Sequence, residues 1–358
     1  MADRVLGKLP DVFLKPDGTR VKSAAEWPAQ RARLLELVVG TEYGGMPPSP
    51  DRVDVEPLWK SASEYQCRVH IGSFAFCLRL YRPKEDGPRP VILTGDGCWR
   101  NMNDHVIDEI NRRGMIAAVF NRLEFAPDLY NCDRVAGIYP MYPDGVFSAI
   151  SAWAWGYHRA MDALCQLDFV DASRVAITGH SRGGKCVLLA GATDERFAYV
   201  NPNNSGAAGC GCYRYWTELD NPPAEGDSRS ERLGDLLRVV SYWLGPAMRQ
   251  YEQCEERIPF DQHTLKALIA PRVLLETEGL GDTWSNPKGT WQTHLAAAEV
   301  WKLLGAAQNM AARYRPGGHD HDLGAFEALM DIMEHGSLPA INPYPDIEPI
   351  FDWKAPEM

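Results

Sequence analysis

One glycine-rich segment, AITGHSRGGKCVLLAGA at residues 176–192, restricts the possible folds more than any other part of this 358-residue chain. It passes from a strand-like apolar stretch, through small residues, into a helix-like apolar stretch. Two motifs with different chemistry fit this pattern. Gly179 to Gly183 give the G-x-S-x-G of a nucleophile elbow around Ser181, whereas Gly179, Gly184 and Lys185 nearly complete a phosphate-binding loop.

The phosphate-binding interpretation lacks one required group. A phosphate-binding loop needs Ser or Thr after its Lys, because that hydroxyl binds Mg²⁺. Here the residue is Cys186, whose sulfur is a poor ligand for a hard cation. Such loops also usually open their domain, whereas several strand-like stretches precede this one. The nucleophile elbow is therefore the favoured interpretation.

Strand-like and helix-like stretches alternate after Pro90, which predicts a mostly parallel central sheet with helices on both faces. An antiparallel hairpin around Gly72-Ser73 precedes this region, and a capping box of Ser23 and Glu26 predicts a helix reaching about Val39. The combination predicts the α/β-hydrolase fold. The predicted strands are residues 90–95, 115–120, 174–178, 197–201, 272–277 and 310–315, and the predicted helices lie near 103–113, 147–167, 183 onward, 289–305 and 323–335.

The chain shows no linker, so we expect a single domain over residues 1–358. It would comprise an N-terminal helix and hairpin (1–85), a catalytic core (86–336) and a proline-rich tail (337–358) that wraps over the surface. Trp153 and Trp155 fall in a helical stretch, where packing is favoured over ligand contact.

The formal net charge of −11 argues against nucleic acid and anionic membranes as partners, because both need basic surface. No stretch of about 20 apolar residues predicts a transmembrane helix. The first residues lack a signal-peptide pattern, which favours a cytoplasmic location, or a secreted or periplasmic one if a leader has been removed. Nine cysteines predict mostly free thiols, with metal binding or pairing at Cys210 and Cys212 as a minor alternative.

Two later loops supply the partners that a serine nucleophile needs. A hydroxyl is activated by a base, which an acid orients, and in α/β-hydrolases the order is Ser, acid, His. One loop carries Glu278 and Asp282 and the next carries His319 and His321, each after a predicted strand. Asp282 could instead cap a turn, one histidine is expected to be structural, and the HDHD run at 319–322 is a weaker candidate for a metal site.

The motif TGHSRGGK resembles the glucuronoyl esterases, carbohydrate esterase family fifteen, whose pattern is Gly, any residue, Ser-Arg, any residue, Gly-Lys. The resemblance covers roughly residues 90–335 and continues in three further stretches: SAISAWAWGYHRAMDAL, IPFDQHTLKALIAPRVLL and GDTWSNPKG. It implies a cofactor-free enzyme, with no metal, that cleaves esters joining 4-O-methyl-glucuronic acid on xylan to lignin alcohols.

The resemblance also implies roles for individual residues. Ser181 is expected to be the nucleophile, His319 the base (with His321 as the alternative) and Arg182 the oxyanion residue, through its backbone N–H and its side chain. Lys185 and Trp284 are expected to contact the sugar, with Glu231 as a further guess. The structural alternatives are a surface ion pair for Arg182 and a solvated side chain for Lys185.

The chain departs from the family's fungal pattern at one place. Fungal members carry a catalytic Glu just before Ser-Gly, where this chain has Asn204. Some bacterial members use an acid after a later strand, where Asp282 stands. We therefore expect a Ser181–His319–Asp282 esterase acting on a small-molecule or oligosaccharide ester, most specifically a glucuronoyl ester. The alternatives are a sugar acetyl esterase and a catalytically silent carbohydrate-binding protein.

Overall fold

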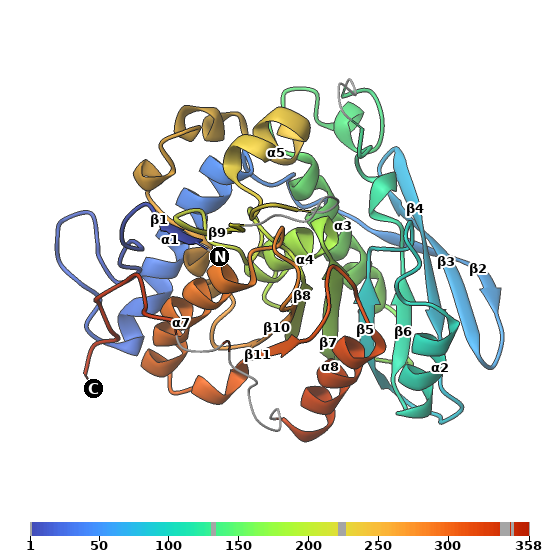
Figure 1. Ribbon diagram of the computed structural model, residues 1–358. Helices are drawn as coiled ribbons and strands as arrows, with labels where there is room; N and C mark the ends of the chain where they lie inside the picture. The colour runs from blue at the N-terminus through green and yellow to red at the C-terminus, as the bar shows by residue number, and fades with distance from the viewer. Residues whose placement is uncertain (1, 130–133, 221–226, 337–343, 345–346, 358) are drawn as a thin grey trace.

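The computed structural model describes residues 2–129, 134–220, 227–336, 344 and 347–357. A nine-stranded sheet runs through the molecule in the order β11-β10-β8-β7-β5-β6-β4-β3-β2 (Figure 1). The pairs from β11 to β6 are parallel, and those from β6 to β2 are antiparallel. The strands of this sheet are β2 Asp54–Lys60, β3 Glu64–Ile71, β4 Phe74–Tyr81, β5 Arg89–Thr94, β6 Ile116–Val119, β7 Val170–His180, β8 Tyr199–Asn203, β10 Val273–Gly279 and β11 Met310–Arg315.

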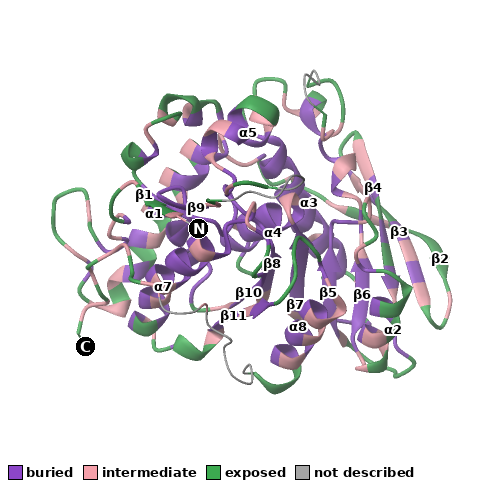
Figure 2. Cartoon of the chain, in the orientation of Figure 1, coloured by how far each residue is buried: buried purple, intermediate pink, exposed green. Residues whose placement is uncertain are grey.

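Helices cover both faces of the sheet, and successive residues of the central strands face opposite layers. In β5, Val91 and Leu93 join the larger core cluster with α3 and α4, whereas Ile92 joins a second cluster with α2 and α8. This two-residue period explains why the parallel strands are buried on both faces (Figure 2). The helices are α1 Trp27–Glu42, α2 Asp104–Arg112, α3 Ala149–Leu164, α4 Arg182–Thr193, α5 Leu233–Val239, α6 Gln262–Ala267, α7 Pro287–Leu303 and α8 Leu323–His335.

The predicted strands and helices after Pro90 are confirmed, as is the hairpin of β3 and β4. The prediction of a capping box at Ser23 and Glu26 was wrong. Ser23 precedes a short 3-10 turn and makes no capping hydrogen bond through its side chain, and α1 begins only at Trp27, with Pro28 in its first turn. A proline there costs nothing, since the first N–H groups of a helix have no partner in the helix.

Three strands were not predicted. The edge strand β2 is mostly exposed and contains Pro57, where its pairing with β3 shifts register. Proline is tolerated at such an edge, but it obscures the strand in the sequence. The other two, β1 (Ala2–Val5) and β9 (Tyr215–Glu218), form a separate two-stranded antiparallel sheet.

The described part of the tail, residues 347–357, packs against the N-terminal segment. Trp353 donates from its indole to the Leu9 carbonyl at 3.0 Å, and the Leu9 amide donates to the Ile350 carbonyl at 3.0 Å. Residues 337–343 and 345–346 of the predicted tail lie outside the described residues. Trp153 and Trp155 are fully buried, as predicted, and donate to the carbonyls of Ala126 and Pro48.

None of the helices in the described ranges has the length and apolar character needed to cross a membrane. Eight of the nine cysteines lie in those ranges, and all eight are free thiols, Cys210 and Cys212 included. The ninth, Cys132, lies outside the described residues.

Candidate active site at the nucleophile elbow

Ser181 occupies the turn between β7 and α4 in a strained conformation. Its backbone angles are φ 56° and ψ −121°, a region that residues with a Cβ rarely adopt. The Ser181 amide donates to the Asn203 carbonyl at 2.9 Å, which ties the turn to the end of β8. This strained strand-to-helix turn is the geometry of a nucleophile elbow.

The glycines of the motif allow this turn to close. A Cβ on Gly179 would lie 2.5 Å from the Gly183 carbonyl oxygen, and one on Gly183 would collide with the Asp96 carboxylate. That carboxylate accepts a 2.8 Å hydrogen bond from the His180 amide and pairs with the buried Arg122. The close packing therefore requires glycine at both positions.

Asp282 and His319 form the pair that the sequence predicted. Asp282 Oδ2 lies 2.6 Å from His319 Nδ1, and the Asp282 side chain is 3% exposed. Burial opposes the charged form of Asp282, but the hydrogen bond and charge of His319 outweigh this effect and hold the pKa of Asp282 below its usual value, with smaller help from Ser285 and Asn204. Asp282 also accepts from the Ser285 amide at 3.2 Å, so the predicted turn contact is present as well.

Asn204 and Ser285 hold this pair from two sides. The Asn204 side-chain amide donates to Asp282 Oδ2 at 2.6 Å, and the Ser285 hydroxyl donates to the Asn204 carbonyl at 3.0 Å. The Ser285 hydroxyl also lies 3.2 Å from His319 Nδ1. The position that carries Glu in the fungal pattern thus contacts the acid rather than replacing it.

The two candidate histidines have different surroundings. The His319 ring centre lies 4.4 Å from that of His180, the residue before the elbow, and its side chain is 40% exposed. The buried His321 ring stacks on Phe326 at 4.2 Å, and burial lowers its pKa well below the usual value. Because His319 makes the contact with Asp282, His321 is the histidine to which we assign a structural role.

Glu278, the other acid near this loop, points elsewhere. It is buried at the end of β10 and accepts a 3.3 Å hydrogen bond from the Thr290 hydroxyl. Burial, with added repulsion from Asp282 and Glu276, raises its pKa well above the usual value. Burial therefore favours the neutral form of Glu278, which does not contact His319.

Arg182 begins α4, and its guanidinium is held on several sides. Its Nη1 donates to Asp128 at 2.7 Å, and its cationic carbon lies 5.3 Å from the Trp99 ring and 4.8 Å from the Trp243 ring. Asp128 also accepts from the Tyr242 hydroxyl at 2.8 Å and from the Trp243 indole at 2.9 Å. The ion pair considered for Arg182 exists, and it fixes the side chain beside the elbow.

Lys185, one turn further along α4, is buried rather than solvated. Its ammonium group donates to the Ser205 carbonyl at 2.7 Å, the Ala207 carbonyl at 2.5 Å and Glu231 at 2.6 Å. An ammonium has three N–H donors, so all of them have protein acceptors. The backbone of Glu231 in turn donates to the Trp284 carbonyl at 2.8 Å. The structure thus joins the predicted sugar contacts Lys185, Glu231 and Trp284 into one connected group.

Comparison with known proteins decides the family. The family model described as glucuronyl esterase of fungi matches residues 67–305. The chain belongs to the glucuronyl esterase family. A 4-O-methyl-glucuronoyl methylesterase of Podospora anserina is 30% identical over 88% of this chain and 64% of its own length, and one of Cerrena unicolor is 28% identical over 88% and 65%. The chain therefore spans just under two thirds of these curated relatives.

Solved structures of the glucuronyl esterase family share the fold. A family 15 glucuronoyl esterase from Caldicellulosiruptor kristjansonii superposes with a TM-score of 0.84 at 28% identity, covering 97% of this chain and 96% of its own. One from Solibacter usitatus gives a TM-score of 0.80 at 26% identity, covering 92% and 98%. The predicted α/β-hydrolase fold is confirmed.

Several residues around the elbow could not be assigned from the sequence. Asp128 and Trp243 lie outside every motif, and Ser285 lies within GDTWSNPKG but had no expected role. In the described part of the chain, the ligand atoms of Asp331, Glu334 and His335 cluster within 4.8 Å of one another, at the partly exposed end of α8. Arg113 pairs with both carboxylates there, so this group has a structural explanation.

Proposed function

We propose that this member of the glucuronyl esterase family hydrolyses carbohydrate esters, and most specifically 4-O-methyl-glucuronoyl esters. The observation that carries the proposal is the hydrogen-bonded Asp282–His319 pair beside the strained Ser181 elbow. The substrate class comes from the relatives, which are 4-O-methyl-glucuronoyl methylesterases.

In the proposed reaction, Ser181 Oγ attacks the ester carbonyl carbon while His319 takes the hydroxyl proton at Nε2. The Nδ1–H of His319 stays hydrogen-bonded to the Asp282 carboxylate, whose negative charge stabilises the imidazolium that forms. The tetrahedral intermediate collapses, His319 returns the proton to the departing alcohol, and an acyl-enzyme remains on Ser181. Water, deprotonated by His319, then attacks the acyl carbon, the bond to Ser181 Oγ breaks, and His319 returns the proton to Oγ, which releases the acid and restores Ser181.

The developing oxyanion needs donors that the protein has not already used. The Ser181 amide is occupied by the Asn203 carbonyl. The proposal therefore gives this role to the backbone N–H of Arg182, the first residue of α4, with the positive charge of its side chain nearby. Asp128 keeps that guanidinium in place, so the charge needs no reorganisation during the reaction.

The buried polar group beside the elbow favours a hydroxylated acyl part over an acetyl group. The methyl of an acetyl ester offers no hydrogen-bonding group to this site, whereas the hydroxyl groups of a sugar can donate to a carboxylate. Because Lys185 has its three acceptors within the protein, we assign the direct sugar contact to Glu231. Lys185 then orients Glu231, and Trp284, which is half-buried, lies next to it in the same group.

Hydrolysis of benzyl glucuronate and of acetylated xylose by the wild-type protein tests the proposal. A kcat/KM that is higher for benzyl glucuronate supports it, whereas a preference for acetylated xylose indicates the acetyl esterase. No turnover of either ester, or of a small aryl acetate, indicates the silent binding protein. Ser181→Ala should leave less than about one part in a thousand of the turnover, as triad loss does in other hydrolases.

The proposed partner is a small-molecule or oligosaccharide ester. Nucleic acid and membranes are not expected partners, on the charge argument alone. The cytoplasmic location expected from the sequence receives no support from the fold or the relatives and stays a prediction.

A further inference from the structure

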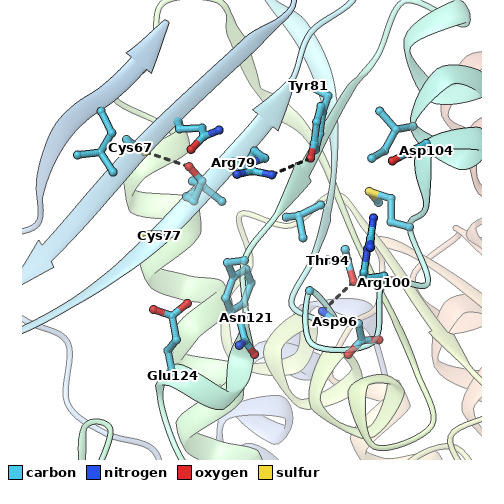
Figure 3. Close-up of a pocket in the computed structure, with 18 residues that line it drawn as sticks. Cys67, Cys77, Arg79, Tyr81, Thr94, Asp96, Arg100, Asp104, Asn121 and Glu124 are labelled. Atoms are coloured by element: carbon cyan, nitrogen blue, oxygen red, sulfur yellow. Dashed lines mark hydrogen bonds between the residues drawn. The ribbon is translucent and has the colours of Figure 1, made fainter.

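A cavity that borders the loop of residues 96–100, next to the elbow, takes no part in the proposed reaction. It has a volume of about 420 Å³ and opens between the β3–β4 hairpin, the ends of β5 and β6, and the first turn of α2 (Figure 3). This volume falls in the range of small-ligand sites in proteins, roughly 300–1,000 Å³. Its polar lining comes from the side chains of Gln66, Arg79, Tyr81, Arg100, Asn121 and Glu124, together with Thr94, Asp96 and Asp104.

The cavity has apolar walls and a polar rim. Leu78, Met102, Val119 and Phe120 supply apolar surface. Figure 3 shows Arg79 and Tyr81 on one side of the space, with Asn121 and Glu124 opposite them. Amide, hydroxyl, guanidinium and carboxyl groups together offer both donors and acceptors. A ligand that fits has apolar faces and an edge of groups that both donate and accept, which describes a pyranose ring with its C–H faces and hydroxyl edge.

The charges around the cavity nearly cancel. Arg79 pairs with Glu64 at 3.3 Å and donates to the Tyr81 hydroxyl at 3.3 Å. Glu124 is half-buried, and burial raises its pKa above the usual value. The carboxylate of Asp96, another residue of the lining, is neutralised by Arg122. The formal negative charge of Asp104 offsets the formal positive charge of Arg100 in the same lining. A strongly charged ligand would find no matching excess of opposite charge, so a neutral one is favoured.

Arg100 is held in an unusual backbone conformation at the edge of this cavity. Its φ is +58°, and its amide donates to the Asp96 carbonyl at 3.1 Å to close a turn. In the described part of the chain its side chain has no hydrogen-bond or ion-pair partner. The neighbouring Trp99 faces the other way, toward His180 and Arg182. Arg100 is exposed, so its guanidinium N–H groups are hydrated and accessible to a ligand, and strained backbone of this kind is found at ligand-binding sites.

We propose that this cavity binds a neutral oligosaccharide segment, with Arg100, Tyr81, Asn121 and Glu124 contacting its hydroxyl groups. The same loop, residues 96–100, borders the elbow and the cavity. A sugar chain could therefore be held here while an ester that it carries is presented to Ser181. The inference goes beyond the proposed function, because binding here needs no chemistry at Ser181.

Titration of the Ser181→Ala protein with xylotriose, a chain of three neutral pyranose rings, tests the inference by calorimetry. Added Arg100→Ala or Tyr81→Phe should each weaken the Kd about tenfold, the effect of one lost hydrogen bond of about 1–1.5 kcal/mol. Tyr81→Phe removes a single hydroxyl and so serves where a larger change disturbs the fold. Arg68→Ala is the matched control, since Arg68 is exposed on the same strand face as Gln66 but does not line the cavity. It should leave the Kd unchanged.

Three outcomes would overturn the inference. They are no binding of xylotriose, a Kd that the two cavity variants leave unchanged, and tighter Arg100-dependent binding of glucuronate than of xylotriose, which would make the ligand an anion. Binding that is lost in Glu231→Ala but kept in both variants would place the sugar at the elbow instead. Absence of turnover on benzyl glucuronate would refute the esterase proposal alone, because the Kd comparison uses a protein without the nucleophile.

Discussion

Asp282→Asn is the substitution that tests the proposed triad most directly. The Asp282 carboxylate accepts from His319 Nδ1 and the Asn204 side chain at Oδ2, and from the Ser285 amide. An amide replaces one of its two acceptor oxygens by a donor. Whichever way it turns, an NH₂ group meets at least one of these donors. The variant therefore loses the negative charge and also gains a clash between donors.

The expected magnitude follows from these contacts. If the amide NH₂ faces His319, the ring is driven to the tautomer that cannot accept the Ser181 proton, and in other triads this change lowers kcat by about 10⁴, or roughly 5.4 kcal/mol of barrier. The buried clash adds about 1–3 kcal/mol of lost stability. Folding must therefore be checked by circular dichroism and thermal unfolding before kcat is compared.

The assay is kcat on benzyl glucuronate for wild type, Asp282→Asn and a matched control. Glu278→Gln is that control, because Glu278 is another buried carboxyl near the same loop that does not contact His319, and burial raises its pKa, which favours the neutral form that the amide imitates. Glu278→Gln should keep kcat close to the wild-type value. A folded Asp282→Asn protein that retains more than about a tenth of kcat would refute the reasoning.

Three further predictions test other parts of the structure. Lys185→Ala should lower kcat/KM for benzyl glucuronate about 10- to 100-fold more than kcat/KM for an aryl acetate, and Glu231→Ala should give the same selectivity. Equal losses of kcat/KM on both esters would contradict a role in sugar recognition. Asn204→Glu should reduce kcat far less than Asp282→Asn, but it places a second carboxyl against Asp282 and should move the acidic limb of the pH–kcat profile to higher pH; an unmoved limb would argue that the two groups are not in contact. Burial lowers the pKa of His263 to about 4, so its contribution to stability is present above pH 6.5 and is lost as the pH falls. Between pH 7.5 and 5 the wild type should lose about 2 kcal/mol more unfolding free energy than His263→Gln, measured in urea, and parallel losses would exclude the effect.

The order of the site along the chain could be predicted because it depends on regular structure. Ser181, Asp282 and His319 each follow a parallel strand, and the carboxyl ends of such strands meet at one edge of a sheet. Short apolar runs that alternate with helix-like stretches identified those strands in the sequence, so the site could be located without knowing any contact. The choice of His319 over His321 was left open, since both follow β11 and only the path of the loop decides which one reaches Asp282.

The environment of Lys185 could not be predicted, because it depends on irregular backbone. Two of its acceptors are the carbonyls of Ser205 and Ala207, in a loop after β8 that has no periodic pattern. Carbonyl direction in such a loop follows individual backbone angles, such as the positive φ of Asn204 (43°) and Gly206 (62°). Asp128 is a similar case, since it meets Arg182 across 54 positions of sequence.

The absence of the fungal Glu, which motivated the alternative of a catalytically silent protein, has a simple geometric explanation. Asn204 and Asp282 are 78 positions apart in the chain, yet Asn204 Nδ2 lies 2.6 Å from Asp282 Oδ2, and that oxygen lies 2.6 Å from His319 Nδ1. The ends of β8 and β10 are neighbours in the sheet, so both positions converge on the same side of the histidine ring. Only one carboxylate fits there without repulsion. A neutral donor at position 204 is therefore what an acid at position 282 requires, and the departure from the fungal pattern is compatible with a complete triad.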